Sequence, residues 1–290
     1  MHSIFIIIGN CQSRIYSNLI PILIPNTEAI PVWLADRSEN GKIRALKAKN
    51  LIKSRASNIY VLTQHITNNS YGFFTTENIK SVFPESKIIT NFYYKGLHPD
   101  LMYFRDDSDN NIKSLIGDYH SKIILQSFFE HVPVEECLKR FCYEYYIEVG
   151  LNKVKDISSF TLLDREKIVD IKFAEQFLHD SLKRLTLLTF NHPTFSTIHD
   201  YVKKIATYYH LNTVVLPENY GFNTLLTDPW WPVYDFVKRD LSITYATYNY
   251  FKGKGEFSRS YTLNYFVEHC YKIYNNISNF KKFYNKYLDN

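Results

Sequence analysis

Residues 4–12 of this 290-residue chain read IFIIIGNCQ, and this stretch decides the fold. The five apolar and mostly β-branched residues at 4–8 are typical of a strand buried on both faces of a parallel sheet. Gly9 ends the run, and apolar residues then recur at helical spacing from Ile15 to Ile20. The chain is therefore predicted to open with a strand, a tight turn and a helix.

The same alternation continues along the first third of the chain. Helices are predicted over about 42–54 and 76–82, and strands over 58–63 and 86–91. Strands that alternate with helices imply crossover connections and a mainly parallel sheet. The predicted fold class is α/β, with this sheet flanked by helices.

The remainder is predicted to be largely helical. Charged and apolar residues are interleaved from about 109 to 179, a strand returns at 185–190, and a helix follows at 197–209. The Tyr-rich stretch from about 234 to 287 is predicted to form a helical packing layer. We expect an α/β part at 1–105 and a mixed, mostly helical part at 106–290, or one integrated domain.

Composition limits the function classes. The net charge is +5, and the basic residues are spread along the chain, which suits an anionic small molecule and does not predict a nucleic-acid partner. The sequence has neither a signal leader nor about 20 consecutive apolar residues, so we expect a cytoplasmic protein without a membrane span. The four cysteines lack paired ligand spacing, and no metal is expected. The oligomeric state is not predicted.

The turn after the first strand carries the strongest chemical signal. A thiol at the start of a helix, as predicted for Cys11, meets unpaired N–H groups and the positive end of the helix dipole, which favour the thiolate. Those N–H groups, with the amides of Asn10 and Gln12, would also stabilise an oxyanion. Gly9 permits a sharp turn and close approach of a ligand. The alternative is that Cys11 is a small buried apolar residue.

Polar residues also follow two other predicted strands. Gln64 and His65 come after the strand at 58–63, and Asn191 and His192 come after the strand at 185–190. Because functional groups gather at the carboxyl edge of a parallel sheet, these residues are candidates for substrate binding or for a general base beside Cys11. Among them His192 is the preferred base.

Three further groups are weaker candidates. The segment 95–100, KGLHPD, offers Lys95 to a phosphate, Gly96 for backbone access, and His98. Arg165, Glu166 and Asp170 are interpreted as an exposed charged helix face. The pair at 230–231, two tryptophans, is interpreted as a core plug. No Gly-rich dinucleotide loop, Walker loop or zinc motif is present.

Together these motifs resemble the WcbI-like family of polysaccharide-biosynthesis acetyltransferases. The matching motifs are IIGNCQ at 7–12, KGLHPD at 95–100, Arg165-Glu166 with Asp170, and FNHP at 190–193, and the resemblance covers roughly residues 4–240. The family is also similar in layout to the SGNH hydrolases, with Cys11 in place of their serine. The residue three positions before His192 is Thr189, where those enzymes have aspartate.

The resemblance implies an enzyme that binds coenzyme A and transfers an acetyl group to a sugar hydroxyl of a capsular or other surface polysaccharide. Cys11 and His192 would be catalytic. Gly9, Asn10, Gln12, Gln64, His65 and Asn191 would bind the oxyanion or substrate, and Lys95, Gly96 and His98 would bind the coenzyme. Cys11 would act as a nucleophile, or would only position the thioester while His192 acts as base.

Two other functions are compatible with the same residues. An esterase or deacetylase would use the Cys11–His192 pair with water as acceptor. A non-catalytic glycan-binding protein would use the aromatic surplus, which is 17% of the chain. Binding of coenzyme A would distinguish a transferase from the esterase or deacetylase and from the glycan-binding protein.

Overall fold

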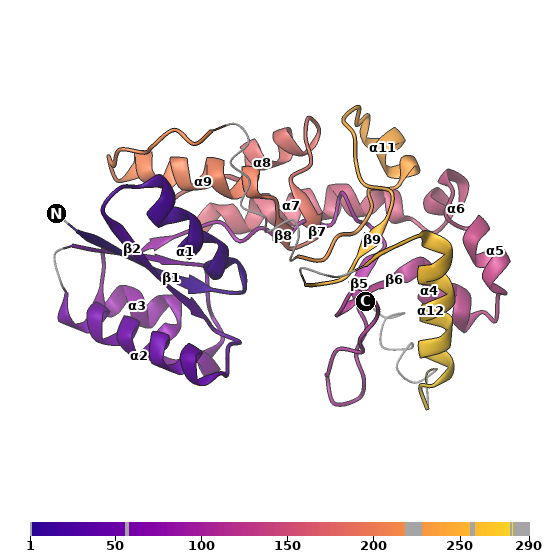
Figure 1. Ribbon diagram of the computed structural model, residues 1–290, viewed down its shortest axis with the longest axis horizontal. Coiled ribbons are helices and arrows are strands. Elements are labelled where there is room, and N and C mark those ends of the chain that lie inside the picture. Colours follow the sequence, from indigo (N-terminus) through magenta and orange to yellow (C-terminus); the bar gives the residue numbers. More distant parts are fainter. Residues whose placement is uncertain (1, 56–57, 218–227, 256–258, 279, 281–290) are drawn as a thin grey trace. The chain divides into compact units, whose positions relative to one another are not determined.

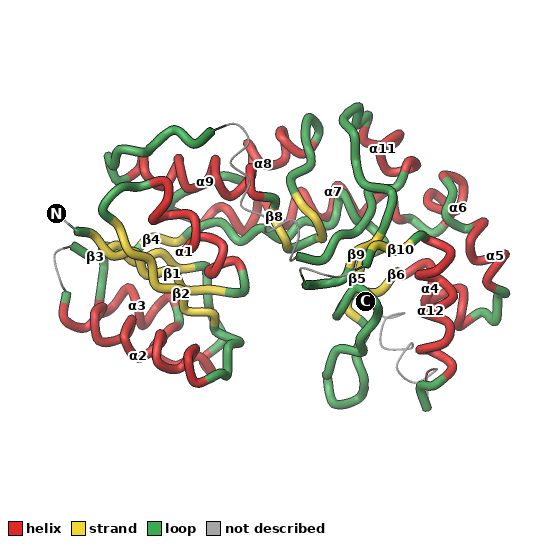
Figure 2. Tube along the Cα trace, in the orientation of Figure 1, coloured by secondary structure: helices red, strands yellow, loops and turns green. Residues whose placement is uncertain are grey.

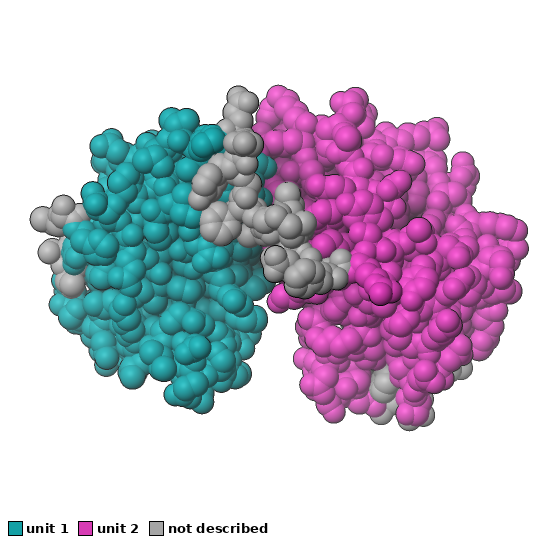
Figure 3. All heavy atoms as spheres, in the orientation of Figure 1, with its two compact units in different colours: residues 1–92, 162–177, 195–221 teal, residues 93–161, 178–194, 222–290 magenta. Residues whose placement is uncertain are grey.

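The computed structural model describes residues 2–55, 58–217, 228–255, 259–278 and 280. The chain divides into two compact units (Figure 3). Unit 1 comprises residues 1–92, 162–177 and 195–221, and unit 2 comprises residues 93–161, 178–194 and 222–290. The units are therefore interleaved along the sequence. The consecutive parts 1–105 and 106–290 stay a prediction.

Unit 1 contains a parallel sheet of four strands in the order β2-β1-β3-β4 (Figure 2). The strands are β1 Ser3–Gly9, β2 Thr27–Trp33, β3 Ile59–Thr63 and β4 Lys87–Ile88. The central strand β1 pairs with β2 and β3, as expected for the buried run at 4–8. The predicted α/β class with a mainly parallel sheet is confirmed.

Helices cover both faces of this sheet. They are α1 Gln12–Leu23, α2 Glu39–Ser54, the 3-10 helix η1 Asn69–Phe74, α3 Thr76–Val82 and α9 Phe195–Tyr208. Figure 1 shows α1 and α9 on one face and α2 and α3 on the other. Ile6 and Ile8 pack in the core with Ala48 of α2, whereas the Phe5 ring stacks on Tyr60 with centroids 4.7 Å apart. The central strand is buried from both sides.

Strand β2 was not predicted. Its sequence, TEAIPVW, contains Glu28 and Pro31, and only Ile30 and Val32 are buried. Proline lacks a backbone donor and is tolerated on edge strands, which is the place that β2 occupies. The strand is therefore defined by its pairing with β1 more than by its composition.

Segments from the middle of the chain complete unit 1 at the other edge. Ile171 forms a parallel bridge with Ile89, directly after β4. This region contains the 3-10 helix η3 Glu166–Ile168, and the two helices α7 Val154–Arg165 and α8 Ala174–Ser181 each extend from one unit into the other. The edge of the sheet is thus closed by residues about 80 positions away.

Unit 2 combines short helices with three two-stranded antiparallel ladders. Its elements are β5 Leu101–Tyr103, β6 Tyr119–Ser121, α4 Lys122–Phe129, α5 Val134–Lys139, α6 Tyr143–Glu148, the 3-10 helix η2 Leu151–Lys153, β7 Leu187–Thr189, β8 His192–Pro193, α11 Asp235–Leu241, β9 Phe251–Lys252, β10 Ser260–Tyr261 and α12 Leu263–Asn275. Helix α12 packs against α4 and α5. Within the described chain, no helix has the length and apolarity that crossing a membrane requires.

The predicted strand at 185–190 exists but does not belong to the parallel sheet. Its core, β7, pairs antiparallel with β8, and both lie in unit 2. The expectation that three strands end at one sheet edge is therefore wrong for this strand. A hydrophobic run indicates a strand but not its partner. In the predicted helical layer at 234–287, α11 and α12 are helical, β9 and β10 lie between them, and residues 281–287 fall outside the described residues.

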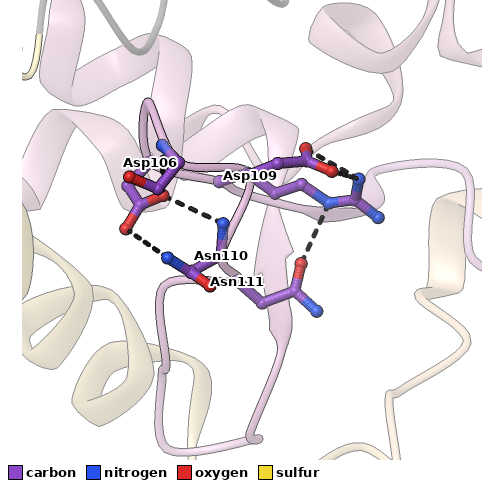
Figure 4. Close-up of polar contacts among 6 residues, drawn as sticks. Asp106, Asp109, Asn110 and Asn111 are labelled. Carbon is purple, nitrogen blue, oxygen red and sulfur yellow. Dashed lines mark hydrogen bonds and ion pairs between the residues drawn. The ribbon is translucent and has the colours of Figure 1, made fainter. Parts of the chain in front are cut away.

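The connection between β5 and β6 is held by its own polar side chains (Figure 4). Asp106 Oδ1 accepts the backbone N–H groups of Ser108 and Asn110, at 2.9 Å each. Arg105 Nη1 contacts both carboxylate oxygens of Asp109, and its Nε donates to Asn111 Oδ1 at 3.0 Å. This loop is locally organised by Asx-type hydrogen bonds.

Candidate active site

The turn between β1 and α1 presents Cys11 at the carboxyl end of the central strand. Cys11 is the N-cap residue of α1, is half-buried, and makes no side-chain cap hydrogen bond to the helix. The side chain of Asn10 accepts the N–H of Gln12 at 2.9 Å instead. The thiol of Cys11 therefore does not cap the N-terminus of α1.

Three amide side chains hold this turn in one conformation. Gln64, which follows β3, accepts the Asn10 N–H through Oε1 at 2.9 Å. Its Nε2 donates to Asn10 Oδ1 at 3.3 Å and to Gln12 Oε1 at 3.1 Å. A Cβ at position 9 would lie 2.5 Å from Gln64 Oε1, so only glycine leaves room for this side chain. Gly9, Asn10, Gln12 and Gln64 are thus brought together, as their positions at strand ends predict.

The first N–H groups of α1 already have acceptors. Gln12 N donates to Asn10 Oδ1, Ser13 N donates to Asn10 O at 3.1 Å, and Arg14 N donates to Cys11 O at 3.2 Å. Gln12 is fully buried, and its Nε2 donates to Phe92 O at 2.7 Å. An oxyanion donor must therefore come from elsewhere in the turn, and the half-exposed Asn10 amide is the side chain with this capacity.

The segment after β4 is tied to the same turn. Phe92 N donates to Gln12 Oε1 at 3.2 Å, while Asn10 Nδ2 donates to Asn91 Oδ1 at 3.1 Å. The segments that follow β1, β3 and β4 are therefore linked, at Asn10, Gln64 and Asn91, by one set of amide hydrogen bonds.

A cavity of about 300 Å³ opens beside this turn within unit 1. Its walls include Gly9 and Asn10 of the turn, Trp33 at the end of β2, and His65 and Tyr71 from the segment after β3. The pairing register sets Gly9 against Trp33, so the cavity lies at the carboxyl ends of adjacent parallel strands. This is the place where open α/β sheets bind ligands.

His192 lies in unit 2, at the start of β8, where hydroxyl groups fix its ring. Its Nδ1 is 2.8 Å from Thr189 Oγ1 and 3.0 Å from Tyr119 Oη. Both hydroxyls donate to Asn191 Oδ1, at 3.0 Å and 2.7 Å respectively, and Asn191 Nδ2 donates to Tyr103 Oη at 3.0 Å. The four side chains around His192 form one connected network.

This network is compatible with a His192 tautomer that is protonated at Nδ1. A hydroxyl has one proton, and in one arrangement Thr189 and Tyr119 both direct theirs to Asn191 Oδ1, although Tyr119 Oη also lies 3.4 Å from Thr189 Oγ1. In that arrangement the hydrogen-bond donor toward these oxygens is Nδ1–H of His192, and the lone pair is on Nε2. Burial, with a smaller contribution from the charge of Lys254, lowers the pKa of His192 to about 4. The ring is therefore neutral near pH 7.

The KGLHPD segment, also in unit 2, is mostly buried. His98 is fully buried, and burial lowers its pKa to about 3. Asp100 accepts hydrogen bonds from Ser121, Trp231 and Tyr234, and burial raises its pKa to about 6. Lys95 is half-exposed, and burial together with the charge of Lys122 lowers its pKa. Of the three predicted coenzyme contacts, Lys95 is the one that is not fully buried.

The sequence model of the protein family described as polysaccharide biosynthesis enzyme WcbI matches residues 4–213 of the chain. The chain belongs to the WcbI family. The resemblance inferred from the four motifs is thereby confirmed, and so is a role in polysaccharide biosynthesis as an enzyme. No protein with a curated description matches the chain.

One solved structure of a WcbI protein has the same fold. It aligns with a TM-score of 0.74 and 12% sequence identity, over 100% of this chain and 96% of the other. That protein is described as WcbI, a novel polysaccharide biosynthesis enzyme, in a native form without a disulfide bond between coenzyme A and one of its cysteines. At this identity the likeness shows the fold.

In this WcbI-family chain, the predicted site residues fall into two groups. Unit 1 holds Gly9, Asn10, Cys11, Gln12, Gln64 and His65, and unit 2 holds Lys95, Gly96, His98, Asn191 and His192. A Cβ at position 96 would lie 2.1 Å from Tyr94 Oη, so Gly96 allows this tyrosine to pack and needs no ligand to explain it. The roles of all these residues stay predictions.

Sequence reasoning missed the groups that support the site. Tyr119 and Tyr103 orient the His192 network, but they are about 70 and 90 positions from it in sequence. The interpretation of Glu166 as part of an exposed face is wrong, because it is buried and accepts hydrogen bonds from Thr90 Oγ1 and Phe173 N. Asp170 similarly accepts the Ile88 N–H at 2.6 Å. These WcbI-motif carboxylates hold the sheet edge beside Asn91.

Proposed function

We propose that this WcbI-family protein transfers an acetyl group from acetyl-coenzyme A to a sugar hydroxyl during assembly of a capsular or other surface polysaccharide. Cys11 and His192 are the catalytic residues of this proposal. The observation that carries it is the neutral His192, whose Nδ1 lies within hydrogen-bond distance of Thr189 Oγ1 and Tyr119 Oη and whose pKa is lowered to about 4 by burial. A neutral imidazole with this orientation is a general base.

The partners of His192 favour a thiol as the group that it deprotonates. In a Ser-His-Asp triad, a carboxylate on Nδ1 stabilises the imidazolium that forms. Here the Nδ1 partners are the hydroxyls of Thr189 and Tyr119, which orient the ring without a negative charge. A thiol is a much stronger acid than an alcohol and requires less help from its base. A cysteine at position 11 is consistent with this weaker base in the first step. In the second step the hydroxyl proton becomes more acidic as its oxygen attacks the acetyl carbon, and the same base takes it during that attack.

In the nucleophilic mechanism, Cys11 Sγ attacks the thioester carbonyl carbon and His192 Nε2 takes the thiol proton. The carbon–sulfur bond to the coenzyme breaks, and the departing sulfur takes the proton from His192. His192 then accepts the proton of the sugar hydroxyl, whose oxygen attacks the acetyl carbon on Cys11. The bond to Cys11 Sγ breaks, and the proton passes to the sulfur. In the direct alternative, the sugar oxygen attacks the thioester, and Cys11 only positions it.

Support for the coenzyme comes from two lysines of unit 2 and from the relative. Burial is the main cause of the lowered pKa of Lys95 and the charge of Lys122 adds to it, and two cations that interact in this way suit a phosphate group. The solved WcbI structure is described with reference to coenzyme A and a cysteine. We assign the coenzyme contact to Lys95, with Gly96 and the buried His98 shaping its loop. When bound, the coenzyme supplies an activated acetyl thioester.

The test is calorimetric titration with coenzyme A and acetyl-coenzyme A, followed by intact-mass measurement without an acceptor. The nucleophilic mechanism predicts saturable binding and an adduct of one acetyl group that Cys11→Ala abolishes. Cys142→Ala is a matched control, because Cys142 is also a half-buried N-cap residue without a side-chain cap bond. Binding without an adduct favours direct transfer. Absence of binding, with turnover of simple acetyl esters, would reject the transferase and support an esterase or deacetylase.

A further inference from the structure

We infer that the cavity of about 300 Å³ beside the Cys11 turn binds one uncharged sugar ring of the acceptor. This inference rests on the proposed function for the identity of its ligand as an acceptor. It adds the location of the acceptor subsite and the charge class of the sugar. The name acceptor cavity is used below for this cavity, which is defined by Asn10, Trp33, His65, Thr67 and Tyr71 among its lining residues.

The lining of the acceptor cavity, twelve residues in all, contains no acidic side chain and no lysine or arginine. A phosphate or a uronic acid would lose its hydration there without a cationic partner, which is unfavourable. The guanidinium of Arg14 lies 5.7 Å from the centroid of the Trp33 ring, but Arg14 is not part of the lining. An uncharged ligand fits this composition.

The polar groups of the cavity are suited to hydroxyl groups. Within the part of the chain that the structure describes, the side chains of His65, Thr67 and Tyr71 make no hydrogen bond to another residue. Asn10 directs one amide proton to Asn91 Oδ1 and has a second one to offer. Amide and hydroxyl groups both donate to and accept from hydroxyls, as a sugar ring requires, and the imidazole adds a further hydrogen-bonding group.

Aromatic rings supply the other half of sugar recognition. Trp33 and Tyr71 are both half-buried, so their rings are partly available at the cavity wall. The C–H surface of a pyranose is apolar and packs on an aromatic ring, while its hydroxyls point to polar groups at the edge. This combination distinguishes the acceptor cavity from an anion site.

Size and position complete the argument. Ligand pockets span about 300 to 1,000 Å³, so a cavity at the lower limit accommodates one ring and not a whole coenzyme. Gly9 and Asn10 belong both to its wall and to the turn that carries Cys11. A hydroxyl of the bound ring would therefore be close to the turn at which we propose that acetyl transfer occurs. The pantetheine arm of the coenzyme, which is also uncharged, is the competing occupant.

Saturation-transfer NMR on the full chain tests this assignment directly, with methyl glycosides of glucose, galactose and mannose as probes. Glucuronate and pantetheine are the comparison ligands. We expect at least one neutral glycoside to bind, with affinity reduced at least tenfold by Trp33→Ala and by Tyr71→Ala. Trp33→Phe should retain most of the affinity for that glycoside. Tyr208→Ala removes an exposed aromatic ring from α9 of the same unit and should change nothing.

Each result separates the cavity assignment from the proposed reaction. Retained coenzyme A affinity in Trp33→Ala, together with lost glycoside binding, supports the acceptor cavity whether or not acetyl transfer is observed. Loss of pantetheine or coenzyme A binding in Trp33→Ala would overturn it and assign the cavity to the acyl donor. Tighter binding of glucuronate than of every neutral glycoside, or no glycoside binding at all, would also overturn it. Circular dichroism and thermal unfolding establish that each variant is folded.

Discussion

The Oγ1 atom of Thr189 lies 2.8 Å from Nδ1 of His192, three residues further along the chain. A carboxylate at this place would raise the pKa of the ring and favour its charged form. The hydroxyl does neither, and burial dominates the protonation of His192, whose pKa is lowered to about 4. The site therefore has a base that is weak but remains unprotonated over a wide pH range.

The pH profile of the reaction should show this property. If neutral His192 is the active form, kcat/KM for acetyl transfer should be constant from neutral pH down to about pH 5. It should fall about tenfold per unit below a pKa of about 4. Because the positive charge of Lys254 contributes to the lowered pKa, Lys254→Ala should move this acidic limb to higher pH, and Lys254→Arg should leave it in place. A limb near pH 6.5 in the wild-type protein would contradict the neutral-histidine assignment.

The hydroxyl of Tyr119 is expected to position His192. Tyr119→Phe keeps the ring contacts with Tyr103 and Phe190 but removes the hydrogen bond to Nδ1. Loss of one such bond, about 1 kcal/mol, should lower kcat about fivefold and leave the KM for acetyl-coenzyme A unchanged. Tyr245→Phe, which removes a tyrosine hydrogen bond to the Ser181 carbonyl, is the control. An equal loss in both variants would indicate a general effect on folding.

Gly9 is expected to be required because Gln64 occupies the space of a Cβ. Gly9→Ala should destabilise the protein by about 1 to 3 kcal/mol, the usual cost of overpacking a tight site. Gln64→Ala should also destabilise it, since the Asn10 N–H loses its acceptor. The double variant should be more stable than the sum of the single effects predicts, because the clash is gone. Strict additivity in urea unfolding would argue against direct contact between positions 9 and 64.

Asp100 should make stability depend on pH in a direction unusual for a carboxyl group. Its folded-state pKa is about 6, above the ordinary value of 3.8, so the folded protein binds more protons between about pH 4 and 6. Its contribution is present below pH 4 and is lost as pH rises through about 6. Asp100→Asn should remove this loss, and Glu85→Gln, at an exposed position, should not.

The measurement is the difference in unfolding free energy between each variant and the wild type across this pH range. A difference is needed because buried histidines act in the opposite direction. The pKa values of His120 and His192 are lowered to about 4, so their contribution is present above pH 6.5 and is lost as pH falls toward 4. A wild-type minus Asp100→Asn difference that does not change from pH 4 to 6 would contradict the raised pKa.

Local patterns predicted the first half of the fold well. The predicted helix at 76–82 coincides with α3, and the strand at 58–63 differs from β3 by one residue. Both are strongly periodic segments with clear end signals. Strand β2 was missed, since its character depends on an edge position next to β1. Assignment of 185–190 to the parallel sheet failed because pairing is a long-range property that a short apolar run does not encode.

The candidate site could likewise be predicted only in part. The GNCQ turn and Gln64 follow directly from strands, so their meeting at one sheet edge could be inferred from alternation alone. The hydroxyls around His192 could not, because Tyr119 belongs to a different ladder and is 73 positions away. The burial of Glu166 could not be predicted from the sequence for a similar reason, since its partner Thr90 is 76 positions earlier.

The interleaved course of the chain has a consequence for attempts to shorten this protein. A fragment ending at residue 92 would contain all four strands but would lack Ile171, which bridges Ile89, and Tyr201, whose hydroxyl accepts the Thr90 N–H. The open edge of β4 would then be an unprotected template for other chains. We therefore expect such a fragment to aggregate, and a proteolytic nick to leave the two pieces associated unless a denaturant separates them.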